Sequence, residues 1–333
     1  MPDLLKPSSV VRYLVSRGVL GGGSTAQASE LEGGISNIVL KVGSKEGQMV
    51  VKQALPQLRV DQEWFAKTDR AVSEGRALEI FGKLTPDAVP RVLDIDREGH
   101  AITMSAAPPR WQNWKTLLLS GEIDTQVGTR LGKLLGTWHA STGGSDEIEQ
   151  EFGDLGAFDQ LRLDPYHRSV IRSRPDLESV IDPYIQQLRD VRRCLVHGDF
   201  SPKNVLVGPT SSDVWILDFE VAHYGNPAFD LAFMMSHLIM KAIHRPADAA
   251  HYHTTFVLLL SSYLKTAPIG LIGSEMQVVG QTGCLLLARV LGKSPAEYLT
   301  KDEQDKVVNL GEAFAREPHR VEAAWYNVLE AVA

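Results

Sequence analysis

Apolar residues alternate with polar ones in short stretches along the first hundred positions of the chain, and they follow helical spacing over most of the remainder. Alternation between glycine-rich turns is typical of antiparallel strands, whereas apolar residues three and four apart indicate helices. The N-terminal part is therefore predicted to be a small antiparallel sheet that carries one helix. We expect an N-terminal helix within residues 1–20, strands at 26–31, 38–42, 48–53, 91–94 and 101–104, and a helix at 70–81.

The change in periodicity divides the chain into two parts of different structure. Beyond a pair of consecutive prolines the pattern becomes mostly helical. We place the boundary between Ser105 and Arg110, which gives an N-terminal nucleotide-binding domain of residues 1–105 and a larger, mainly helical domain of residues 106–333. The predicted fold class is α+β.

Two apolar runs in the helical part, residues 231–240 and 256–264, fall short of the roughly 20 residues that a helix needs to cross a bilayer. We interpret them as core helices and expect no membrane association. One hairpin interrupts the helices, because residues 195–207 and 214–217 have the apolar character of strands and are joined by a turn at 208–212. The candidate chemistry of the chain is concentrated in this hairpin.

Composition narrows the range of partners. The formal charge is −7 and the lysines and arginines are scattered, so no basic stripe is present of the kind that neutralises nucleic-acid phosphates. The only cysteines, Cys194 and Cys284, lie in a predicted strand and in an apolar helical run, which favours buried thiols over a disulfide. Residues 1–20 lack the uninterrupted apolar core of a signal peptide, and we expect a cytoplasmic location.

Three polar side chains of the hairpin are placed to act together. Asp199 and Asn204 belong to the segment His-Gly-Asp-Phe-Ser-Pro-Lys-Asn, and Asp218 follows the second strand. Antiparallel register puts Asn204 and Asp218 side by side at one end of the ribbon, with Asp199 in the loop before it. Two carboxylates and an amide oxygen suit Mg²⁺ when phosphate oxygens complete its shell. Phosphoryl transfer also needs a carboxylate that accepts the proton of the attacking hydroxyl, and Asp199 is placed for this task.

The spacing His-x-Asp-x-x-x-x-Asn is a weak signal by itself, because three fixed positions match by chance in about 4% of chains of this length. A polar turn whose Asp and Asn cap local backbone groups produces the same letters. A metal-dependent phosphohydrolase built on His197 and Asp199 needs more metal-binding histidines than the region offers. The apolar strands on both sides, with Asp218 at hairpin distance, favour phosphoryl transfer.

A glycine-containing turn in the N-terminal part is a candidate for binding a nucleotide. It joins the first two strands and contains Gly33, Gly34, Ser36 and Asn37. Glycines allow backbone N–H groups to approach phosphate oxygens closely. Taken alone, the segment is also an ordinary hairpin turn.

Lys52 interrupts an apolar strand and therefore requires an anionic partner. Glu74 lies on the apolar stripe of the helix at 70–81 and is predicted to face the sheet, whereas Glu79 lies on the opposite side. A Lys52–Glu74 ion pair that holds the α- and β-phosphates of a nucleotide is the functional interpretation. A surface lysine beside an unrelated, half-buried glutamate is the alternative.

Asn226 and Pro227 are typical of a helix start, which places Asp230 in the first turns of a long helix. Favourable interaction with the helix N-terminus accounts for an acidic residue at this position. Alternatively, the Asp230 carboxylate reaches back to the backbone of the loop at 197–199. The residues alone leave both interpretations open.

Together these segments resemble the aminoglycoside phosphotransferase and choline kinase superfamily of small-molecule kinases, which has a two-lobed, protein-kinase-like fold. The resemblance implies an ATP- and Mg²⁺-dependent phosphotransferase that moves the γ-phosphate to a hydroxyl of a small molecule. The matching segments are His197-Gly198-Asp199 to Asn204, Asp218-Phe219-Glu220-Val221-Ala222, Phe229-Asp230-Leu231-Ala232, and Lys52 with the pattern Arg70…Glu74…Leu78.

The resemblance also assigns roles to individual residues. Asp199 is the catalytic base, Asn204 and Asp218 bind magnesium, and Asp230 braces the catalytic loop, which His197 orients. Glu220 is implied to be a further metal ligand, directly or through water, as in choline kinases and methylthioribose kinases. Ser105 stands where relatives often carry an acidic hinge residue, so the preference for adenine over guanine is left open.

Two other kinds of protein are weighed against this prediction. A regulated protein kinase is disfavoured, because Phe-Glu rather than Phe-Gly follows Asp218 and no Ala-Pro-Glu closes an activation segment. A catalytically silent nucleotide-binding module is the alternative function. The joint presence of Lys52, Glu74, Asp199, Asn204 and Asp218 argues against silence.

The phosphate acceptor is left open by the sequence. The spacing from Asp218 to Asp230 is similar to that of methylthioribose kinases, which however usually have a serine where this chain has Asn204. Choline kinases need aromatic faces around a quaternary amine, and tryptophans at helical spacing more often pack in a core. His139 and the other histidines of the helical part show no zinc-binding spacing and are interpreted as structural.

Overall fold

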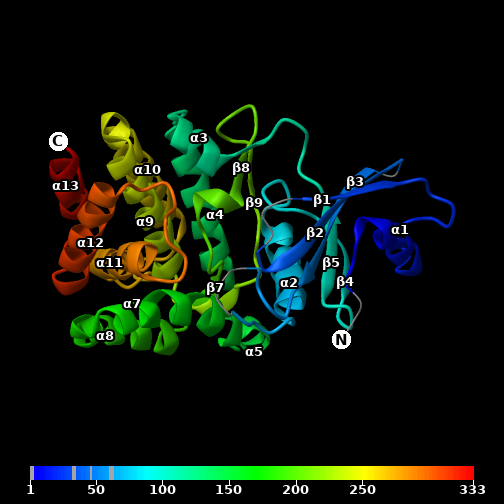
Figure 1. Cartoon of the computed structure of the whole chain (residues 1–333), viewed down its shortest axis with the longest axis horizontal. Coiled ribbons are helices and arrows are strands. Elements are labelled where there is room, and N and C mark those ends of the chain that lie inside the picture. The colour runs from blue at the N-terminus through cyan, green and yellow to red at the C-terminus, as the bar shows by residue number, and fades with distance from the viewer. Residues whose placement is uncertain (1–3, 32–34, 46, 60–63) are drawn as a thin grey trace. The chain divides into compact units, whose positions relative to one another are not determined.

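The protein, seen here as a computed structural model, is described over residues 4–31, 35–45, 47–59 and 64–333. It is a mixed α+β chain, as predicted, and it forms two compact units whose elements are labelled in Figure 1. The first unit comprises Met1–Pro109 and Trp215–Val221, and the second comprises Arg110–Val214 and Ala222–Ala333. The chain therefore returns to the first unit for one short segment, and this segment carries Asp218.

A five-stranded antiparallel sheet with the order β1-β2-β3-β5-β4 forms the first unit. Every strand expected in this region is present within one or two residues of its predicted bounds. The strands are β1 (Gln27–Glu30), β2 (Asn37–Ser44), β3 (Gly47–Ala54), β4 (Val92–Asp96) and β5 (Ala101–Ser105), and the helices are α1 (Pro7–Ser16) and α2 (Arg70–Leu84). Strand β3 is central, because Lys52 pairs with Val39 of β2 on one side and with Ile102 of β5 on the other.

Helix α2 packs against β3, β4 and β5 with the face that the sequence predicts. Glu74 is 1% exposed and shares this face with Leu78 and Phe81, so its predicted orientation is confirmed. Glu79 lies on the partly exposed side, where it pairs with Arg76. The helix extends three residues beyond the predicted end at 81, and the Thr85 hydroxyl donates to the carbonyl oxygen of Phe81 where it stops.

The rest of the chain contains two small sheets, of which β9 runs into the first-unit segment Trp215–Val221, and the second unit adds a large set of helices (Figure 1). Strands β7 (Cys194–Val196) and β10 (His223–Gly225) form one antiparallel pair, and β6 (Gln112–Asn113), β8 (Val205–Val207) and β9 (Val214–Ile216) form a sheet in the order β6-β8-β9. The helices, including a π-helix (η1) and short 3₁₀ turns, are α3 (Trp114–Ser120), α4 (Gln126–Thr142), α5 (Asp146–Phe152), α6 (Gly156–Phe158), η1 (Asp159–Arg168), α7 (Ser169–Ser173), η2 (Pro175–Leu177), α8 (Glu178–Asp190), η3 (Pro202–Asn204), α9 (Ala228–His244), η4 (Pro246–Asp248), α10 (Ala249–Thr266), α11 (Glu275–Leu291), α12 (Lys301–Arg316) and α13 (Val321–Val332).

Residues 195–207, predicted as one side of the hairpin with Asp199 in a loop, form β7, a loop with the turn η3, and β8. Gly198 has a φ of +76°, in the left-handed region that extended strands do not use, and Pro202 begins η3. The sequence prediction missed the short strands β6 and β10. The interrupted strand places the His197–Asn204 stretch as a loop between two anchored strands.

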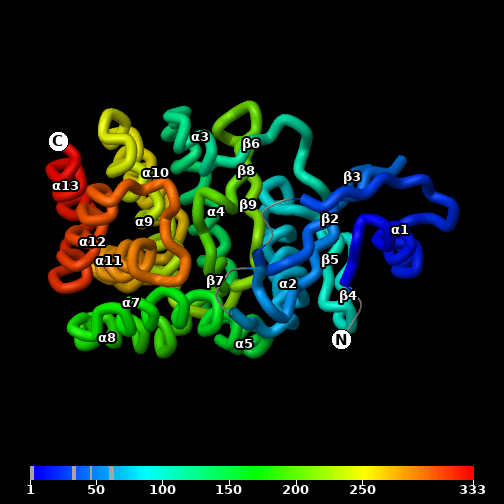
Figure 2. Tube along the Cα trace, in the orientation of Figure 1, coloured from blue at the N-terminus to red at the C-terminus, as the bar shows by residue number. Residues whose placement is uncertain are grey.

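Helix α9 forms the centre of the second unit. Its side chains from Ala228 to Ile243 are all buried, and α10, α11, α12 and α13 pack around it. The tube in Figure 2 shows the neighbouring course of α9, α10 and α11. The two apolar runs predicted to be core helices are confirmed as parts of α9 and α10, and both cysteines are buried free thiols as expected.

No helix in the described part of the chain combines the length and hydropathy that crossing a bilayer requires.

Helix α4 approaches α10 closely along a stripe of glycines at every fourth position. A Cβ atom on Gly128 would lie 2.2 Å from the carbonyl oxygen of Thr255, and one on Gly132 would lie 2.0 Å from that of Leu259. Gly136, one turn further, faces the backbone near Tyr263. Only glycine fits such an approach of backbone to backbone, and the stripe fixes the position of the helix that carries His139.

We predict that Gly132→Ala lowers the free energy of unfolding by about 3 kcal/mol, because the added methyl group meets backbone atoms that cannot move aside independently. Gly82→Ala in α2 is the matched control, since its Cβ would meet only Val89 Cγ2 at 3.7 Å. The control should raise the stability by about 1 kcal/mol through helix propensity. Urea unfolding of both variants checks the prediction, and equal stabilities for the two would contradict the close approach of α4 to α10.

Candidate active site

Lys52 is the central charge of the first unit. Its ammonium donates to Glu74 Oε1 at 2.9 Å, lies 2.8 Å from Glu74 Oε2 as an ion pair, and also forms an ion pair with Asp218 Oδ1. The predicted ion pair between Lys52 and Glu74 is therefore present, and both side chains are buried. Asp218, which the sequence assigned to metal binding, joins the same lysine.

Lys52 and the carboxylates around it shift one another's pKa values. Burial lowers the pKa of Lys52, but the nearby carboxylates of Asp218, Glu74 and Glu220 outweigh it and raise the pKa above its ordinary value. Burial raises the pKa of Glu74, Lys52 opposes this, and the charges of Asp218 and Glu220 add to it. Lys52 is thus firmly cationic, and it is surrounded by more negative charge than it neutralises alone.

The backbone at Asp218 is strained. Its φ of +70° lies in the left-handed region, which non-glycine residues seldom adopt. Neighbouring contacts hold it there, because the Phe219 N–H donates to Glu74 Oε1 at 3.3 Å and the Phe219 ring lies 5.3 Å from that of Phe81. In this conformation the Asp218 carboxylate pairs with Lys52, and strain of this kind is found mostly at functional sites.

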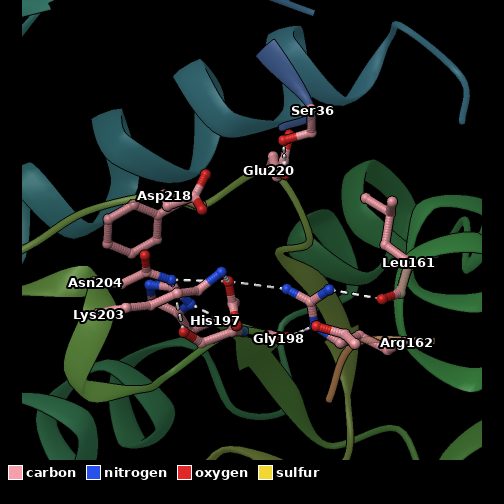
Figure 3. A network of polar contacts seen from close by, with 12 residues as sticks. Ser36, Leu161, Arg162, His197, Gly198, Lys203, Asn204, Asp218 and Glu220 are labelled. Carbon is pink, nitrogen blue, oxygen red and sulfur yellow. Dashed lines mark hydrogen bonds and ion pairs between the residues drawn. The ribbon is translucent and has the colours of Figure 1, made fainter. Parts of the chain in front are cut away.

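Glu220 connects the segment around Asp218 to the turn before β2. Its Oε1 accepts from the Ser36 hydroxyl at 2.7 Å, and its Oε2 accepts from Asn37 Nδ2 at 2.8 Å and from Arg70 Nε at 3.0 Å (Figure 3 shows the Ser36 contact). Arg70 also donates to the backbone carbonyl of Ser36. The structure thus brings together Ser36, Asn37 and Glu220 from the predicted sites, whereas Gly33 and Gly34 lie outside the described residues.

Asp199 is held in the second unit by three side chains that all reach its Oδ2. Arg162 Nη2 and Lys203 Nζ each lie 2.9 Å from this atom, and Asn204 Nδ2 donates to it at 2.8 Å (Figure 3). Asp199 Oδ1 is buried and accepts no hydrogen bond from the described residues. A buried carboxylate oxygen without a donor is costly, so its retention points to a role in chemistry.

The amide of Asn204 is oriented by the same loop. Its Nδ2 donates to Asp199 Oδ2 and also to the Asp199 backbone carbonyl, at 2.8 and 2.9 Å. Because both donors of the amide point toward Asp199, Oδ1 points away from it as the acceptor. An amide oxygen set in this way has the polarity that a hard cation such as Mg²⁺ requires.

Asp230 braces the catalytic loop from the first turn of α9. Its Oδ2 accepts from the His197 N–H at 2.7 Å, and its Oδ1 accepts from the Gly198 N–H at 2.8 Å. The interpretation in which Asp230 reaches back to the loop is confirmed. Helix α9 begins at Ala228, one residue later than Pro227 suggested, and Asn226 Oδ1 accepts from the Ala228 N–H.

Asp230 has a further partner in His139 of α4, whose Nε2 lies 3.2 Å from its Oδ2. The Nδ1 atom of His139 lies 3.0 Å from the Tyr263 hydroxyl on α10, so the imidazole is held from both sides. Burial raises the pKa of Asp230, but the hydrogen bond and charge of His139 and the backbone donors together hold it below its ordinary value. The loop is thus fixed by an ionised carboxylate.

His197 contributes to the geometry of the loop. Its Nδ1 accepts from the Asp199 N–H at 3.1 Å, which a neutral imidazole with its proton on Nε2 allows. Such a contact restrains the backbone next to the Asp199 carboxylate, as the predicted orienting role requires.

Two residues around these loops, Arg162 and Lys203, were assigned no role by the sequence prediction. His139 was interpreted as structural, and its buried contacts with Asp230 and Tyr263 agree with this. Lys203 lies four residues after Asp199 in the same sequence segment, and this spacing could have indicated its contact with the Asp199 carboxylate. Arg162 lies between two leucines in a segment broken by Pro165, and its position depends on a π-helix that no simple periodicity reveals.

We predict that Asp230→Asn lowers the free energy of unfolding at pH 7 by about 3 kcal/mol, because the amide cannot accept from two N–H groups and pair with His139 as the carboxylate does. The lowered pKa means that the carboxylate stabilises the fold above pH 3.8, the ordinary aspartate value, and that this contribution is lost as the pH falls further. Urea unfolding should therefore show a difference from wild type that narrows below pH 3.8. Asp182→Asn, at an exposed position of α8, is the control and should change neither the free energy of unfolding nor its dependence on pH. If the stability difference between Asp230→Asn and wild type does not change with pH, the Asp230 carboxylate does not act in its ionised form.

Comparison with known proteins gives a family and a fold. The model of the phosphotransferase enzyme family matches residues 27–259. Methylthioribose kinase of Bacillus cereus (strain ATCC 10987 / NRS 248) is 26% identical over 335 aligned positions, which cover 86% of this chain and 84% of that protein. The kinase of the same name from Bacillus mycoides (strain KBAB4) is 25% identical, with coverage of 86% and 84%.

Solved structures agree at the level of the fold. A choline/ethanolamine kinase family protein from Mesorhizobium loti superposes with a TM-score of 0.53 at 16% identity, covering 98% of this chain and 99% of that one. Plasmodium vivax ethanolamine kinase gives a TM-score of 0.53 at 11% identity, covering 97% and 87%. These likenesses confirm the predicted two-lobed, kinase-like fold, and since the family model spans well over half of the residues, the chain belongs to the phosphotransferase enzyme family.

Proposed function

We propose that the protein transfers the γ-phosphate of ATP to a hydroxyl of a small molecule, with Asp199 as the catalytic base. The chain is a small-molecule kinase by its family and by the curated relatives that it matches over most of its length. The observation that carries the assignment of the base is the buried, donor-free Oδ1 of Asp199. Because Arg162, Lys203 and Asn204 occupy only Oδ2, Oδ1 is the atom that receives the proton of the attacking hydroxyl.

Lys52 and Glu74 form the proposed anchor for the nucleotide. The Lys52 ammonium is held rigidly by Glu74, so it can meet the α- and β-phosphates without first losing rotamer freedom. The turn with Gly33, Gly34, Ser36 and Asn37 is proposed to cover the phosphates. Support comes from Ser36 and Asn37, whose side chains Glu220 and Arg70 tie down.

Asn204, Asp218 and Glu220 are the proposed ligands of Mg²⁺. The orientation of the Asn204 amide and the strained, inward-facing Asp218 carboxylate fit a hard cation. When bound, Mg²⁺ neutralises the phosphate oxygens as charge develops on them. Glu220 already accepts three hydrogen bonds, so a direct contact with the metal would use the lone pairs that these bonds leave.

The alternative of a catalytically silent module finds no support in the relatives, which are kinases by name. A cytoplasmic location is part of the proposal, because ATP is available there and both cysteines are buried free thiols.

We predict that Asp199→Asn lowers kcat by a factor of roughly 10³ while Mg·ATP still raises the melting temperature, because the amide cannot accept the hydroxyl proton. The assay measures ADP release with aminoglycosides, choline, ethanolamine, methylthioribose and homoserine as acceptors. Asp190→Asn, at an exposed position at the end of α8, is the matched control and should retain wild-type turnover. Full activity of Asp199→Asn would disprove the assignment of the base.

We further predict that Lys52→Met lowers kcat/KM for ATP by roughly 100-fold, because it removes the charge that meets the phosphates. Lys52→Arg keeps the charge and should retain part of the activity with a normal melting temperature. Lys41→Met, at an exposed position of β2, is the control for the loss of a lysine from the sheet. If Lys52→Met folds and uses ATP as well as the control does, the proposed anchor is wrong.

A further inference from the structure

Lys241 of α9 is a buried ammonium without a carboxylate partner. Its exposed fraction is 0%, and no acidic side chain of the described residues forms an ion pair with it. Its Nζ lies 3.4 Å from the carbonyl oxygen of His237 and 5.5 Å from the ring centre of Tyr298. These contacts do not replace the hydration that a lysine loses on burial, so the position is costly for stability.

Other cations gather around Lys241 from several elements. They are Lys115 of α3 and Arg289 of α11, and the imidazole of His237, one turn earlier on α9, lies in the field of the same charges. Arg289 donates to Ser294, but its Nε is buried without an acceptor, and the Tyr298 hydroxyl beside Lys241 is also buried and unpaired among the described residues. We refer to Lys115, His237, Lys241 and Arg289 as the cationic cluster.

The cluster has the same electrostatic effect on two of its own groups and on the neighbouring Tyr166. Burial, with the charges of Lys115 and Arg289, lowers the pKa of Lys241 to about 7. The pKa of His237 is held well below its ordinary value by burial and by Lys241, Arg289, Lys203 and Lys115. Burial raises the pKa of the Tyr166 hydroxyl, yet Arg289 and Arg162 bring it below its ordinary value. Each group thus experiences a positive local potential.

The cationic cluster is connected to the catalytic loop by direct contacts within the second unit. Arg162 holds Asp199 and also lies over the ring of Phe233, 5.6 Å from its centre. The Phe233 ring packs against His237 at 5.3 Å, and the ammonium of Lys241 lies at the level of the His237 carbonyl. Seven residues of α9 separate Asp230 from His237, which is about 10 Å along the helix axis.

We infer that the phosphate acceptor carries an anionic group, a carboxylate or a phosphate ester, which binds at the cationic cluster of Lys115, His237, Lys241 and Arg289 while its hydroxyl faces Asp199. This inference rests on the proposed function and specifies the class of its substrate. An anion supplies the negatively charged partner that Lys241 lacks and the hydrogen-bond acceptor that Arg289 Nε lacks. A polycationic or quaternary amine acceptor would instead be repelled by the same potential.

Binding of simple anions tests the cluster independently of catalysis. The full chain is saturated with Mg²⁺ and a non-hydrolysable ATP analogue, and its melting temperature is measured in inorganic phosphate or acetate against chloride at equal ionic strength. We expect at least one of the two anions to raise the melting temperature of the wild type by several degrees. Absence of a rise with both anions overturns the inference.

Variants locate the binding. Lys241→Met should be at least as stable as wild type in chloride, because it removes an unpaired buried charge, and it should lose most of the rise with the anion. Arg289→Gln, at a partly exposed position, is a second variant with the same expectation. Lys306→Met, at an exposed position of α12, is the control and should keep the full rise. A rise that persists in both Lys241→Met and Arg289→Gln places the anion elsewhere and also overturns the inference.

Turnover with matched alcohols separates the inference from the proposed function. Glycerate is compared with glyceramide, and ribose 5-phosphate with ribose, since each pair differs in one anionic group. We expect the anionic member of at least one pair to have a kcat/KM more than tenfold higher, and Lys241→Met to remove this preference. Turnover of neutral or cationic alcohols alone refutes the anionic class and leaves the kinase intact. Anion binding that depends on Lys241, without turnover of any alcohol, supports the cluster and refutes the proposed function.

Discussion

The proposed catalytic loop, residues 197–204, depends on one buried carboxylate, that of Asp230. Two consecutive backbone N–H groups of the loop donate to it, and His139 lies against it from another helix. A carboxylate bound in this way joins α9, α4 and the loop at one point. The position of the Asp199 side chain follows from this joint, because Asp199 comes directly after the two braced residues.

The joint in turn depends on how closely two helices pack. His139 reaches Asp230 only because α4 lies against α10, where backbone carbonyls of α10 occupy the space that a Cβ on Gly128 or Gly132 would need. Tyr263 of α10 then restrains the far side of the imidazole. Residues without any chemistry of their own thus determine the geometry of the groups that perform it.

The sequence predicted most of the fold and selected the candidate residues of the site, because both leave local signals. Alternation located the sheet strands, helical phase placed Glu74 on the inner face of α2, and the spacing in the hairpin selected Asp199, Asn204 and Asp218. It failed where structure depends on contacts between distant segments. The position of Arg162 required a π-helix, and the contact of His139 with Asp230 required a helix packing that no local pattern encodes.

The distribution of charge in the two units adds a constraint that neither the motif nor the fold expresses. In the first unit, Lys52 and Arg70 are the cations among the carboxylates of Glu74, Asp218 and Glu220, so negative charge is in excess. In the second unit, the cations near Asp199 outnumber the single carboxylate that Arg162 and Lys203 share. An excess of buried charge lowers stability unless a ligand of opposite sign offsets it. The proposed metal ion would meet this need in the first case and the inferred anionic acceptor in the second, so both proposals follow from the sign of the charge that each unit holds in excess.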